Sequence, residues 1–387
     1  MDEERTSTSL NDMLAYSNRA VRGSRTGALR HLSEILSPAP PISNRKIQGI
    51  GFLVVDGAKL KVLLLSRAEI EGLISMHEAI EAVEGAFRAK GLGKVQMPPK
   101  SYVYFKSYDG DFRVMPAYLE DTGAAGVKIV NAHPRNPEEH GLPTVMATIL
   151  LLDPKTGAPL AIMDGTMITN IRTGAGGAVA AKYLARKDSR TVAMIGAGVQ
   201  AKTQLLALNE VLKIEEVRVN DMFTKKAEQY AEEMGGKLGI DVKVAKKAEV
   251  AVEGADIVVT TTPARKPILM NEWVSEGMHI NAIGADAPGK QELDPKILLR
   301  AEVVVDDVEQ AIHGGEVNVP LSRGIIARGD IYADLGEIVA KKKPGRTSRD
   351  EITVFDSTGL AVQDIATDWV VYKKAKAMGK GREVELL

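Results

Sequence analysis

The feature that most constrains this chain is a glycine-rich turn between a short apolar run and a helical one. The run Thr191–Ile195 predicts a strand, Gly196-Ala197-Gly198-Val199-Gln200-Ala201 follows directly, and a helical pattern continues to Leu212. In such a turn the first glycine permits the bend, the second lets a bound group touch the backbone, and the small last residue allows close packing of helix on strand. Free N–H groups at the helix start favour a phosphate. The pattern predicts a dinucleotide-binding βαβ unit.

Short apolar segments alternate with helical ones through the rest of this region. The expected strands are Val192 to Ile195, Val217 to Asn220, Val242 to Ala245, Ile257 to Thr261, His279 to Ile283 and Val303 to Val305, with a last strand near Thr353 to Phe355. This alternation predicts an α/β fold with a doubly wound, parallel sheet of the Rossmann type. An isolated glycine turn need not bind anything, but strand, turn, helix and a later carboxylate occur together here, which favours a bound dinucleotide.

The carboxylate is Asp221, which stands directly after the second of these strands. Its distance from the glycines is close to the spacing of about 20 residues at which an acidic side chain binds the adenosine ribose. Because a 2′-phosphate would meet a like charge there, NAD is favoured as the cofactor, while Lys225 and Lys226 leave NADP open. The motif does not name the substrate.

The segments before residue 176 predict an α+β domain. Ser75 with Glu78 forms a capping box that begins a helix ending at Gly91. Strand-like runs follow at Tyr102 to Phe105, Phe112 to Met115, Gly126 to Val130, Thr144 to Leu152 and Leu160 to Met163. A glycine- and alanine-rich helical segment, Gly165 to Ala185, connects the domains, and an amphipathic helix, Leu360 to Ala377, is expected to pack back on the first one. We expect residues 58–175 and 356–387 to form the first domain, residues 176–355 to bind the dinucleotide, and residues 1–57 to be a poorly ordered extension.

Composition excludes several classes of function. Lys and Arg total 50 against 51 Asp and Glu, a net charge of −1, so no general attraction to nucleic acid or to anionic membranes is expected. No cysteine is present, which rules out disulfides and thiolate chemistry and fits a reducing, cytoplasmic location. The longest apolar runs, such as Val145 to Leu152, fall far short of the roughly 20 residues that span a bilayer. We therefore expect no nucleic-acid and no membrane partner.

A metal site is not predicted either. His133 and His140 flank Glu138 and Glu139, but this stretch has the proline content of a loop and lacks the spacing of a metal-binding helix.

Five charged side chains are candidates for chemistry beside a nicotinamide cofactor: Lys100, Arg113, Lys128, Arg172 and Asp286. Arg113 and Lys128 lie on predicted strands, and Asp286 follows a predicted parallel strand at its carboxyl end, where open α/β sheets place their ligands. A single charged side chain is at least as often solvated or ion-paired as it is catalytic, so spacing alone does not select among these five residues.

Several motifs that follow one another along the chain select the candidate residues more specifically. They are Gly126-Val-Lys128-Ile-Val-Asn131-Ala-His133-Pro134, Gly141-Leu-Pro-Thr144, Thr169-Asn-Ile-Arg172-Thr173, Gly284-Ala-Asp286-Ala-Pro-Gly-Lys290 and Asp356-Ser357-Thr358-Gly359. From about Leu63 onward the chain thereby resembles the ornithine cyclodeaminase and mu-crystallin family. Lys100 with Phe112-Arg113-Val-Met-Pro116 is most similar to the archaeal alanine dehydrogenases of that family. Its cyclodeaminases carry a glutamate at the position of Arg113, which faces the distal amine of ornithine, whereas an arginine suits a short substrate with only a carboxylate to bind.

The resemblance implies a homodimer whose first domain serves substrate binding and dimerisation and receives the C-terminal helix. It implies Lys128 and Asp286 as the acid/base residues, and places substrate-side positions at Lys100, Arg113, Thr144 and Thr358. The cofactor residues it implies are Arg172, Gly196, Gly198, Val199, Gln200, Asn220, Asp221, Thr262, Ile283, Gly284, Lys290 and Ser357.

The expected activity is the reversible, NAD-dependent oxidative deamination of L-alanine to pyruvate and ammonia. Arg113 and Lys100 would hold the substrate carboxylate, and Lys128 and Asp286 would face each other and exchange protons. Three alternatives stay open: an ornithine cyclodeaminase forming proline, a ketimine or imino-acid reductase, and a non-catalytic NAD-dependent binding protein of the mu-crystallin type. The presence of both Lys128 and Asp286 argues against the last.

Overall fold

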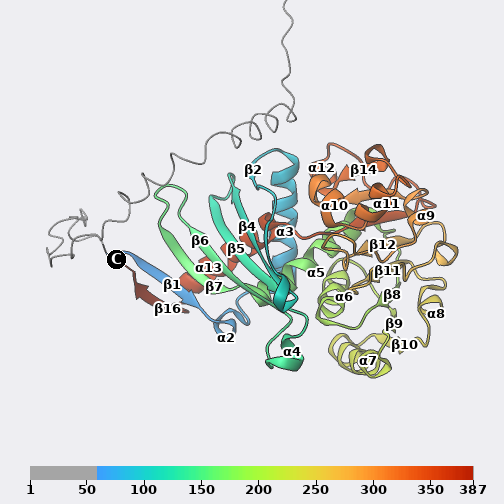
Figure 1. Cartoon of the computed structure of the whole chain (residues 1–387), viewed down its shortest axis with the longest axis horizontal. Coiled ribbons are helices and arrows are strands. Elements are labelled where there is room, and N and C mark those ends of the chain that lie inside the picture. Colours follow the sequence, from blue (N-terminus) through green and yellow to red (C-terminus); the bar gives the residue numbers. More distant parts are fainter. Residues whose placement is uncertain (1–58, 387) are drawn as a thin grey trace, which may run out of the picture. The chain divides into compact units, whose positions relative to one another are not determined.

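Two eight-stranded sheets form the part of the chain that the computed structural model describes, residues 59–386 (Figure 1). The extension expected over residues 1–57 lies outside the described residues. The strand order is β16-β1-β7-β6-β5-β4-β2 in the first sheet, where β3 also pairs with β4, and β10-β9-β8-β11-β12-β15-β13-β14 in the second. Among the described residues no helix is both long and apolar enough to cross a bilayer.

The first sheet is antiparallel apart from the parallel pair β1 and β7. Its strands are β1 (Lys61–Leu65), β2 (Val95–Gln96), β3 (Ser101–Phe105), β4 (Gly110–Leu119), β5 (Ala124–Ala132), β6 (Val145–Leu152), β7 (Pro159–Asp164) and β16 (Arg382–Glu385). The register of β4 on β5 places Arg113 opposite Val130 and Met115 opposite Lys128. Since side chains alternate along a strand, all four lie on one face of the sheet.

Two helices cover that same face, α5 (Gly165–Leu184) and α13 (Ala361–Ala377), and α3 (Met76–Gly91) packs against both of them. The one-turn helices α2 (Arg67–Ile70) and α4 (Asn136–Glu139) and the 3₁₀ turn η1 (Lys106–Tyr108) belong to the same part of the chain. The expected capping box is present at Ser75, and the side chains of Val83 and Phe87 in α3 are fully buried. Figure 1 shows α13 lying against the first sheet, so the chain returns to it after completing the second.

The second sheet confirms the predicted doubly wound fold, because all its neighbouring strands are parallel. Its strands are β8 (Thr191–Ile195), β9 (Glu216–Asn220), β10 (Asp241–Val244), β11 (Ile257–Thr260), β12 (His279–Ala282), β13 (Glu302–Val305), β14 (Ile331–Asp334) and β15 (Thr353–Asp356). The connecting helices are α6 (Val199–Val211), α7 (Thr224–Leu238), α8 (Ala248–Val252), α9 (Pro295–Leu298), α10 (Val308–Gly314), α11 (Asn318–Ser322) and α12 (Leu335–Val339), with the 3₁₀ turns η2 (Asn271–Trp273) and η3 (Arg328–Asp330).

Two close helix contacts join the layers around the sheets. In α5 the glycines allow α6 to approach so closely that a Cβ at Gly174 would overlap the Thr203 carbonyl oxygen. The end of α3 meets α12 in the same way, since a Cβ at Gly91 would overlap the Gly336 carbonyl oxygen. Helix α5 runs unbroken through the domain boundary expected at residue 176 and packs on strands of both sheets.

Candidate functional site

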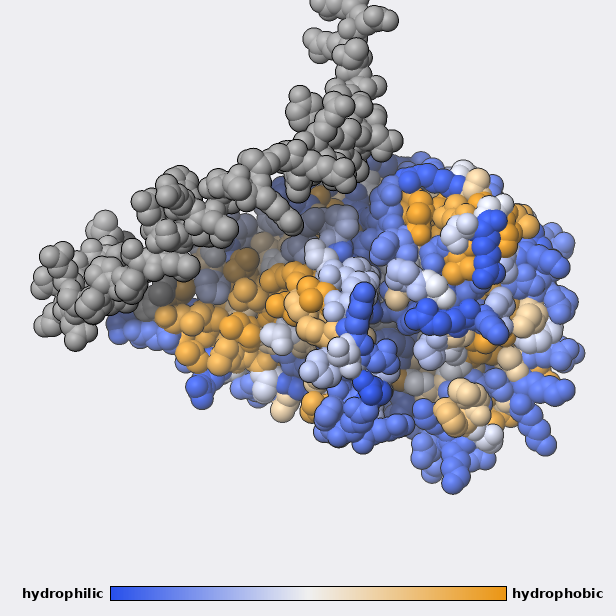
Figure 2. Space-filling model, viewed as in Figure 1, coloured by the Kyte–Doolittle hydropathy of each residue, from blue (hydrophilic) through white to orange (hydrophobic). Residues whose placement is uncertain are grey.

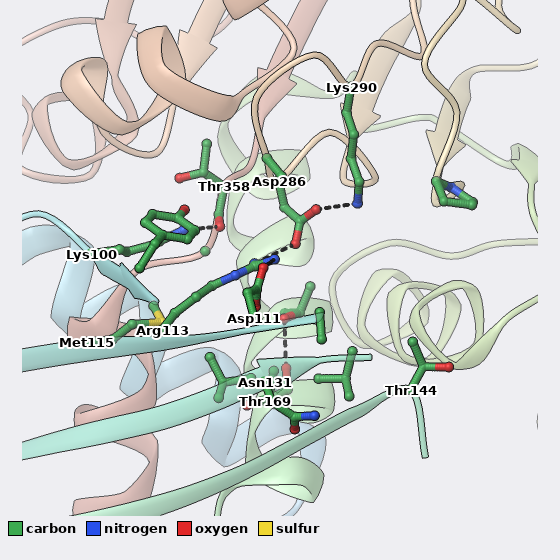
Figure 3. Close-up of a pocket in the computed structure, with 18 of the residues that line it drawn as sticks. Lys100, Asp111, Arg113, Met115, Asn131, Thr144, Thr169, Asp286, Lys290 and Thr358 are labelled. Atoms are coloured by element: carbon green, nitrogen blue, oxygen red, sulfur yellow. Dashed lines mark hydrogen bonds and ion pairs between the residues drawn. The ribbon is translucent and has the colours of Figure 1, made fainter. Parts of the chain in front are cut away.

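A cavity of about 910 Å³ opens between the β4–β5 hairpin, the start of α5 and the loops that follow β12 and β15. Eleven of the residues selected from the sequence line it: Lys100, Arg113, Lys128, Thr144, Arg172, Gln200, Ile283, Asp286, Lys290, Ser357 and Thr358. Figure 3 shows Arg113 of β4 meeting Asp286 from the opposite wall, while Lys100, from the loop before β3, points to Thr358. The structure thus brings together most of the side chains that the motifs predicted, although they come from distant parts of the sequence.

Lys128 lies at the floor of this cavity and is only 1% exposed. Its Nζ is 2.6 Å from Oδ2 of Asp364, on α13, and 3.4 Å from Oγ1 of Thr169. Burial, reinforced by the nearby charge of Arg172, lowers the pKa of Lys128 to about 7, even though Asp364 acts in the opposite direction. The amine can therefore be neutral, and able to accept a proton, near neutral pH.

Asp286 lines the same cavity as Lys128, but the two side chains form no ion pair with each other. Its Oδ2 accepts a hydrogen bond from Arg113 Nη1 at 3.1 Å, and its Oδ1 from Lys290 Nζ at 2.5 Å (Figure 3). Burial alone would raise the pKa of Asp286, but Lys290 and Arg113 outweigh it and hold that pKa below its usual value. Lys128 and Asp286 thus each have a different ion-pair partner, and the exchange of protons between them stays a prediction.

Arg113 is fixed by two carboxylates and an aromatic ring. Besides Asp286 it donates to Asp111 Oδ2 at 3.3 Å, and its Cζ lies 5.4 Å from the ring centroid of Tyr102. Its Nε is buried and has no hydrogen-bond partner among the described residues. The guanidinium therefore has a fixed orientation at the cavity and retains an unused donor.

Lys100 enters the cavity from the loop before β3. Its Nζ donates to the Thr358 carbonyl oxygen at 2.6 Å, while Thr358 is itself held by hydrogen bonds from its N and Oγ1 to Asp306. Burial lowers the pKa of Lys100 to about 8 despite the nearby charges of Asp306 and Asp286. One bond to a carbonyl leaves further ammonium protons free for an anion in the cavity.

Arg172 is positioned by α13. Its Nε donates to Asp364 Oδ1 at 2.8 Å and its Nη1 to Gln363 Oε1 at 3.2 Å. Asp364 thus bridges Arg172 and Lys128, a role that the sequence did not reveal because no motif marks this position of the helix. Asp111 was also missed, although its place two residues before Arg113 on the same strand puts both side chains on one face.

The remaining selected residues surround the glycine turn rather than the cavity: Gly196, Gly198, Val199, Asn220, Asp221, Thr262 and Gly284. Gly196 has a φ of 100°, and a Cβ there would lie 2.7 Å from Thr261 Oγ1, so glycine is required. Asp221 accepts hydrogen bonds from the Ala197 and Phe223 N–H groups, both at 2.9 Å. These bonds hold the carboxylate beside the turn.

The turn itself leaves room and donors for an anion. Space is open where a Cβ of Gly198 would stand, and this residue begins α6 without a side-chain cap. Within residues 59–386 the N–H groups of Gly198, Val199 and Gln200 have no hydrogen-bond acceptor. Free donors and open space at a helix start fit a pyrophosphate. In the same part of the chain no group of three or more His, Asp or Glu side chains is arranged to hold a metal ion.

Comparison with known proteins assigns most of the described region to one family. The model of the ornithine cyclodeaminase/mu-crystallin family matches residues 60–379. The chain is 52% identical to the alanine dehydrogenase of Archaeoglobus fulgidus over 329 residues, which are 84% of this chain and 99% of that protein.

Two solved structures show the same architecture. An archaeal alanine dehydrogenase dimer with bound NAD matches with a TM-score of 0.82 and 52% identity, covering 85% of this chain and all of that one. The Δ1-pyrroline-2-carboxylate reductase of Thermococcus litoralis, in complex with NADH and L-proline, matches with a TM-score of 0.81 and 46% identity, over 84% of this chain and all of that one. With fold, glycine turn and motifs in agreement, the chain belongs to the ornithine cyclodeaminase/mu-crystallin family.

Proposed function

We propose that this protein is an NAD-dependent dehydrogenase that converts L-alanine reversibly to pyruvate and ammonia. The observation that carries this proposal is the placement of Arg113 and Lys128 on one face of the β4–β5 hairpin, both lining one cavity. A guanidinium suits the carboxylate of a short amino acid, and a buried amine suits the removal of a proton from its α-ammonium group. The similarity to the Archaeoglobus fulgidus enzyme supports the same activity.

NAD fits the residues around the glycine turn. The free N–H groups of residues 198–200 would bind the pyrophosphate, and Asp221 would accept hydrogen bonds from the adenosine ribose. Four other residues selected for the cofactor line the cavity beyond the turn: Arg172, Ile283, Lys290 and Ser357. When bound, the nicotinamide takes up the two electrons removed from the substrate α-carbon.

The chain's own groups bind the substrate and move its protons. Arg113 and Lys100 hold the carboxylate, and neutral Lys128 accepts a proton from the α-ammonium group before the carbon is oxidised. Water then adds to the resulting iminium carbon. One proton of that water passes to the nitrogen, which leaves as ammonia, and the other is released as the carbonyl of pyruvate forms. Asp286, held ionised by Lys290 and Arg113, is assigned to accept a hydrogen bond from the substrate amine or from that water.

One assay separates this activity from the cyclodeaminase alternative. We expect the protein with NAD and L-alanine to produce NADH, followed by absorbance, and the protein with NAD and L-ornithine to form no proline. Proline and ammonia from ornithine without net NADH would assign it to the cyclodeaminases instead. No turnover of either amino acid, with NAD still bound, would favour a binding protein.

Reduction of a cyclic imino acid is the second candidate. The Thermococcus litoralis reductase, 46% identical to this chain, is the observation that favours it, and Arg113 could bind the carboxylate of such a ring equally well. Consumption of NADH with Δ1-pyrroline-2-carboxylate, at a higher kcat/KM than pyruvate with ammonia, would make this the principal reaction.

Arg113→Gln is expected to raise the KM for alanine by about 10- to 100-fold, because a charge-assisted hydrogen bond to the substrate carboxylate is lost. The Kd of NAD should stay unchanged, since none of the proposed pyrophosphate donors is altered. Steady-state kinetics and NAD titration test both statements. Arg113→Lys keeps the charge and serves as the control, with a smaller rise in KM; an unchanged KM in Arg113→Gln would remove this residue from substrate binding.

The deamination rate should depend on pH through two lysines. Lys128, with its pKa at about 7, must be neutral to act as a base, so kcat/KM rises as the pH increases through about 7. Lys100, with its pKa at about 8, must be charged to bind the carboxylate, so the KM for alanine increases above about pH 8. A pH profile of kcat and KM measures both effects, and a flat profile between pH 6 and 8 would contradict the assignment of Lys128.

We further propose that the protein forms a homodimer through the open face of the first sheet. Figure 2 shows hydrophobic side chains gathered over these strands, and the face opposite Lys128 exposes Ile129 and Val103. A contiguous exposed apolar patch of this kind is typical of an interface. Light scattering should give twice the chain mass, and Ile129→Glu should shift the protein toward the monomer.

A further inference from the structure

The loop after β15, residues 357–359, contacts two of the cations at the cavity. The carbonyl oxygen of Thr358 accepts a hydrogen bond from Lys100 Nζ at 2.6 Å (Figure 3). Gly359, with a φ of 77°, lies against the guanidinium of Arg172, because a Cβ there would stand 2.7 Å from Arg172 Nη1. The position of this loop therefore affects where both cations lie.

Asp306, directly after β13, fixes the loop. Its Oδ2 accepts hydrogen bonds from the N–H groups of Thr358 at 2.7 Å and Gly359 at 2.6 Å, and its Oδ1 accepts one from Thr358 Oγ1 at 2.9 Å. The N–H group of Asp306 donates to the Asp356 carbonyl oxygen at 3.1 Å, which ties it to the neighbouring strand β15. The side chain of Asp306 is 0% exposed. A buried carboxylate is thus joined to Lys100 through a single residue, Thr358.

The negative charge of Asp306 also acts on Lys100. Burial raises the pKa of Asp306 to about 6, although the charge of Lys100 and the hydrogen bonds from the loop oppose that rise. The carboxylate is therefore ionised at the pH at which Lys100, with its pKa at about 8, loses its proton. Among the charges that act on Lys100, that of Asp306 favours the ammonium form most strongly.

We propose that Asp306 is the positioning residue for the substrate carboxylate: it holds the loop after β15 against Lys100 and supplies the charge that keeps Lys100 an ammonium group. The inference rests on the proposed role of Lys100 in binding the carboxylate. Asp306 is not among the residues that line the cavity, so it acts on the substrate only through Lys100. Its charge thereby sets the highest pH at which the protein binds a small carboxylic acid well.

The other charges around Lys100 do not favour the ammonium form by themselves. Asp286 favours it, but this carboxylate is already paired with Lys290 and Arg113. The guanidinium groups of Arg113 and Arg172 act against it, as does burial. The ammonium form of Lys100 therefore depends on a further anion.

The carboxyl groups around Asp306 are paired or neutral. Asp307, at the start of α10, and Asp334, at the end of β14, both pair with Lys90 of α3. Asp356, on β15, is buried, which raises its pKa to about 8, so it carries a proton at neutral pH. Of these carboxyl groups in the described part of the chain, Asp306 is the one that is ionised near neutral pH without an ion pair.

Asp306→Asn separates the charge from the hydrogen bonds. The amide oxygen can accept both loop N–H groups and the amide nitrogen can donate to Thr358 Oγ1, so the loop keeps its place while the charge is lost. The pKa of Lys100 should fall by about one unit, so the KM for alanine should be about five- to tenfold above the parent's at about pH 8.5 and approach it at about pH 6.5. The kcat should keep its rise near pH 7, because Lys128 is not altered.

Asp306→Ser removes the charge together with most of the acceptor positions. It should show the same shift along the pH axis and, in addition, a higher KM for alanine at every pH, because the loop is held less firmly against Lys100. This variant is smaller than the parent side chain and keeps the pH test available if Asp306→Asn folds poorly.

Asp307→Asn is the matched control. It removes a charge from the next position of the chain, and asparagine can still accept the hydrogen bond from the Gln310 N–H group that begins α10. The pH dependence of its KM should equal the parent's. A profile of Asp306→Asn equal to the parent's, or an equal shift in Asp307→Asn, would overturn the proposal and leave Asp306 a residue of the fold alone.

Binding of propionate, an unreactive carboxylate of the size of alanine, tests the inference without turnover. Calorimetric titration in the presence of NAD should give a Kd that rises above about pH 8 for the parent, and about one pH unit lower for Asp306→Asn. If the parent makes no NADH from alanine, the proposed function fails, while propionate still reports whether Asp306 controls the charge of Lys100. The same pH dependence of the Kd in both proteins, or no binding by the parent, would contradict the inference.

Discussion

Lys128→Ala should lower kcat for alanine deamination by about 10²- to 10⁴-fold, the usual contribution of a general base, and leave NAD binding nearly intact. The reason is that Lys128 lies at the cavity floor, in an ion pair with Asp364, while the glycine turn belongs to the second sheet. NADH production measures turnover, and titration with NAD under the same conditions measures binding.

Lys128→Met serves as the control for packing, since it fills most of the same space without an amine. Both variants should lose turnover to the same extent if the proton-accepting nitrogen is what matters. NADH production equal to that of the parent in either variant would exclude Lys128 as the base. Loss in Lys128→Ala alone would mean that the cavity left by the missing side chain is responsible.

Gly91→Ala should lower the free energy of unfolding by about 3 kcal/mol or more. The last residue of α3 meets α12 backbone to backbone, and the added methyl group would overlap the Gly336 carbonyl oxygen. Neither backbone can move without shifting Lys90, which pairs with Asp334 at the end of β14 and, at 3.1 Å, with Asp307 at the start of α10. Denaturant or thermal unfolding measures the change.

The same helix supplies the matched control. Gly85 is exposed, and a Cβ there would meet nothing within 4 Å. Gly85→Ala should therefore stabilise the protein by about 0.5–1 kcal/mol, because alanine has the higher helix propensity. Equal effects of the two substitutions would mean that α3 and α12 can move apart to make room for a methyl group.

The sequence predicted the second sheet well because each of its strands is a short apolar run bounded by turn residues. Strand β14 was missed, since Ile331–Asp334 has only two apolar residues beside a tyrosine and an aspartate. Strand β1 was missed for the opposite reason: the apolar run in Lys61–Leu65 has no alternation, and such a run does not distinguish strand from helix.

Only those site residues that belong to local sequence motifs could be predicted from the sequence. Residues on the glycine turn and on β4 and β5 follow from local patterns, and the resemblance to a family gathered them into one pocket. The ion-pair partners of the charged residues could not be predicted from local patterns. Arg172 and Asp364, for example, are 192 positions apart, and only the packing of α13 brings them together. For the same reason the sequence did not reveal that the ion-pair partner of Lys128 is the carboxylate of Asp364 on α13.

The late position of α13 in the chain also has a consequence for how the protein matures. Lys128 can form its ion pair with Asp364 only after the whole second sheet has been synthesised and α13 has packed on the first sheet. Contacts across such a separation are slow to form. During refolding, secondary structure should thus recover before catalytic competence, and an assembly intermediate would hold a lysine that still titrates like one in water.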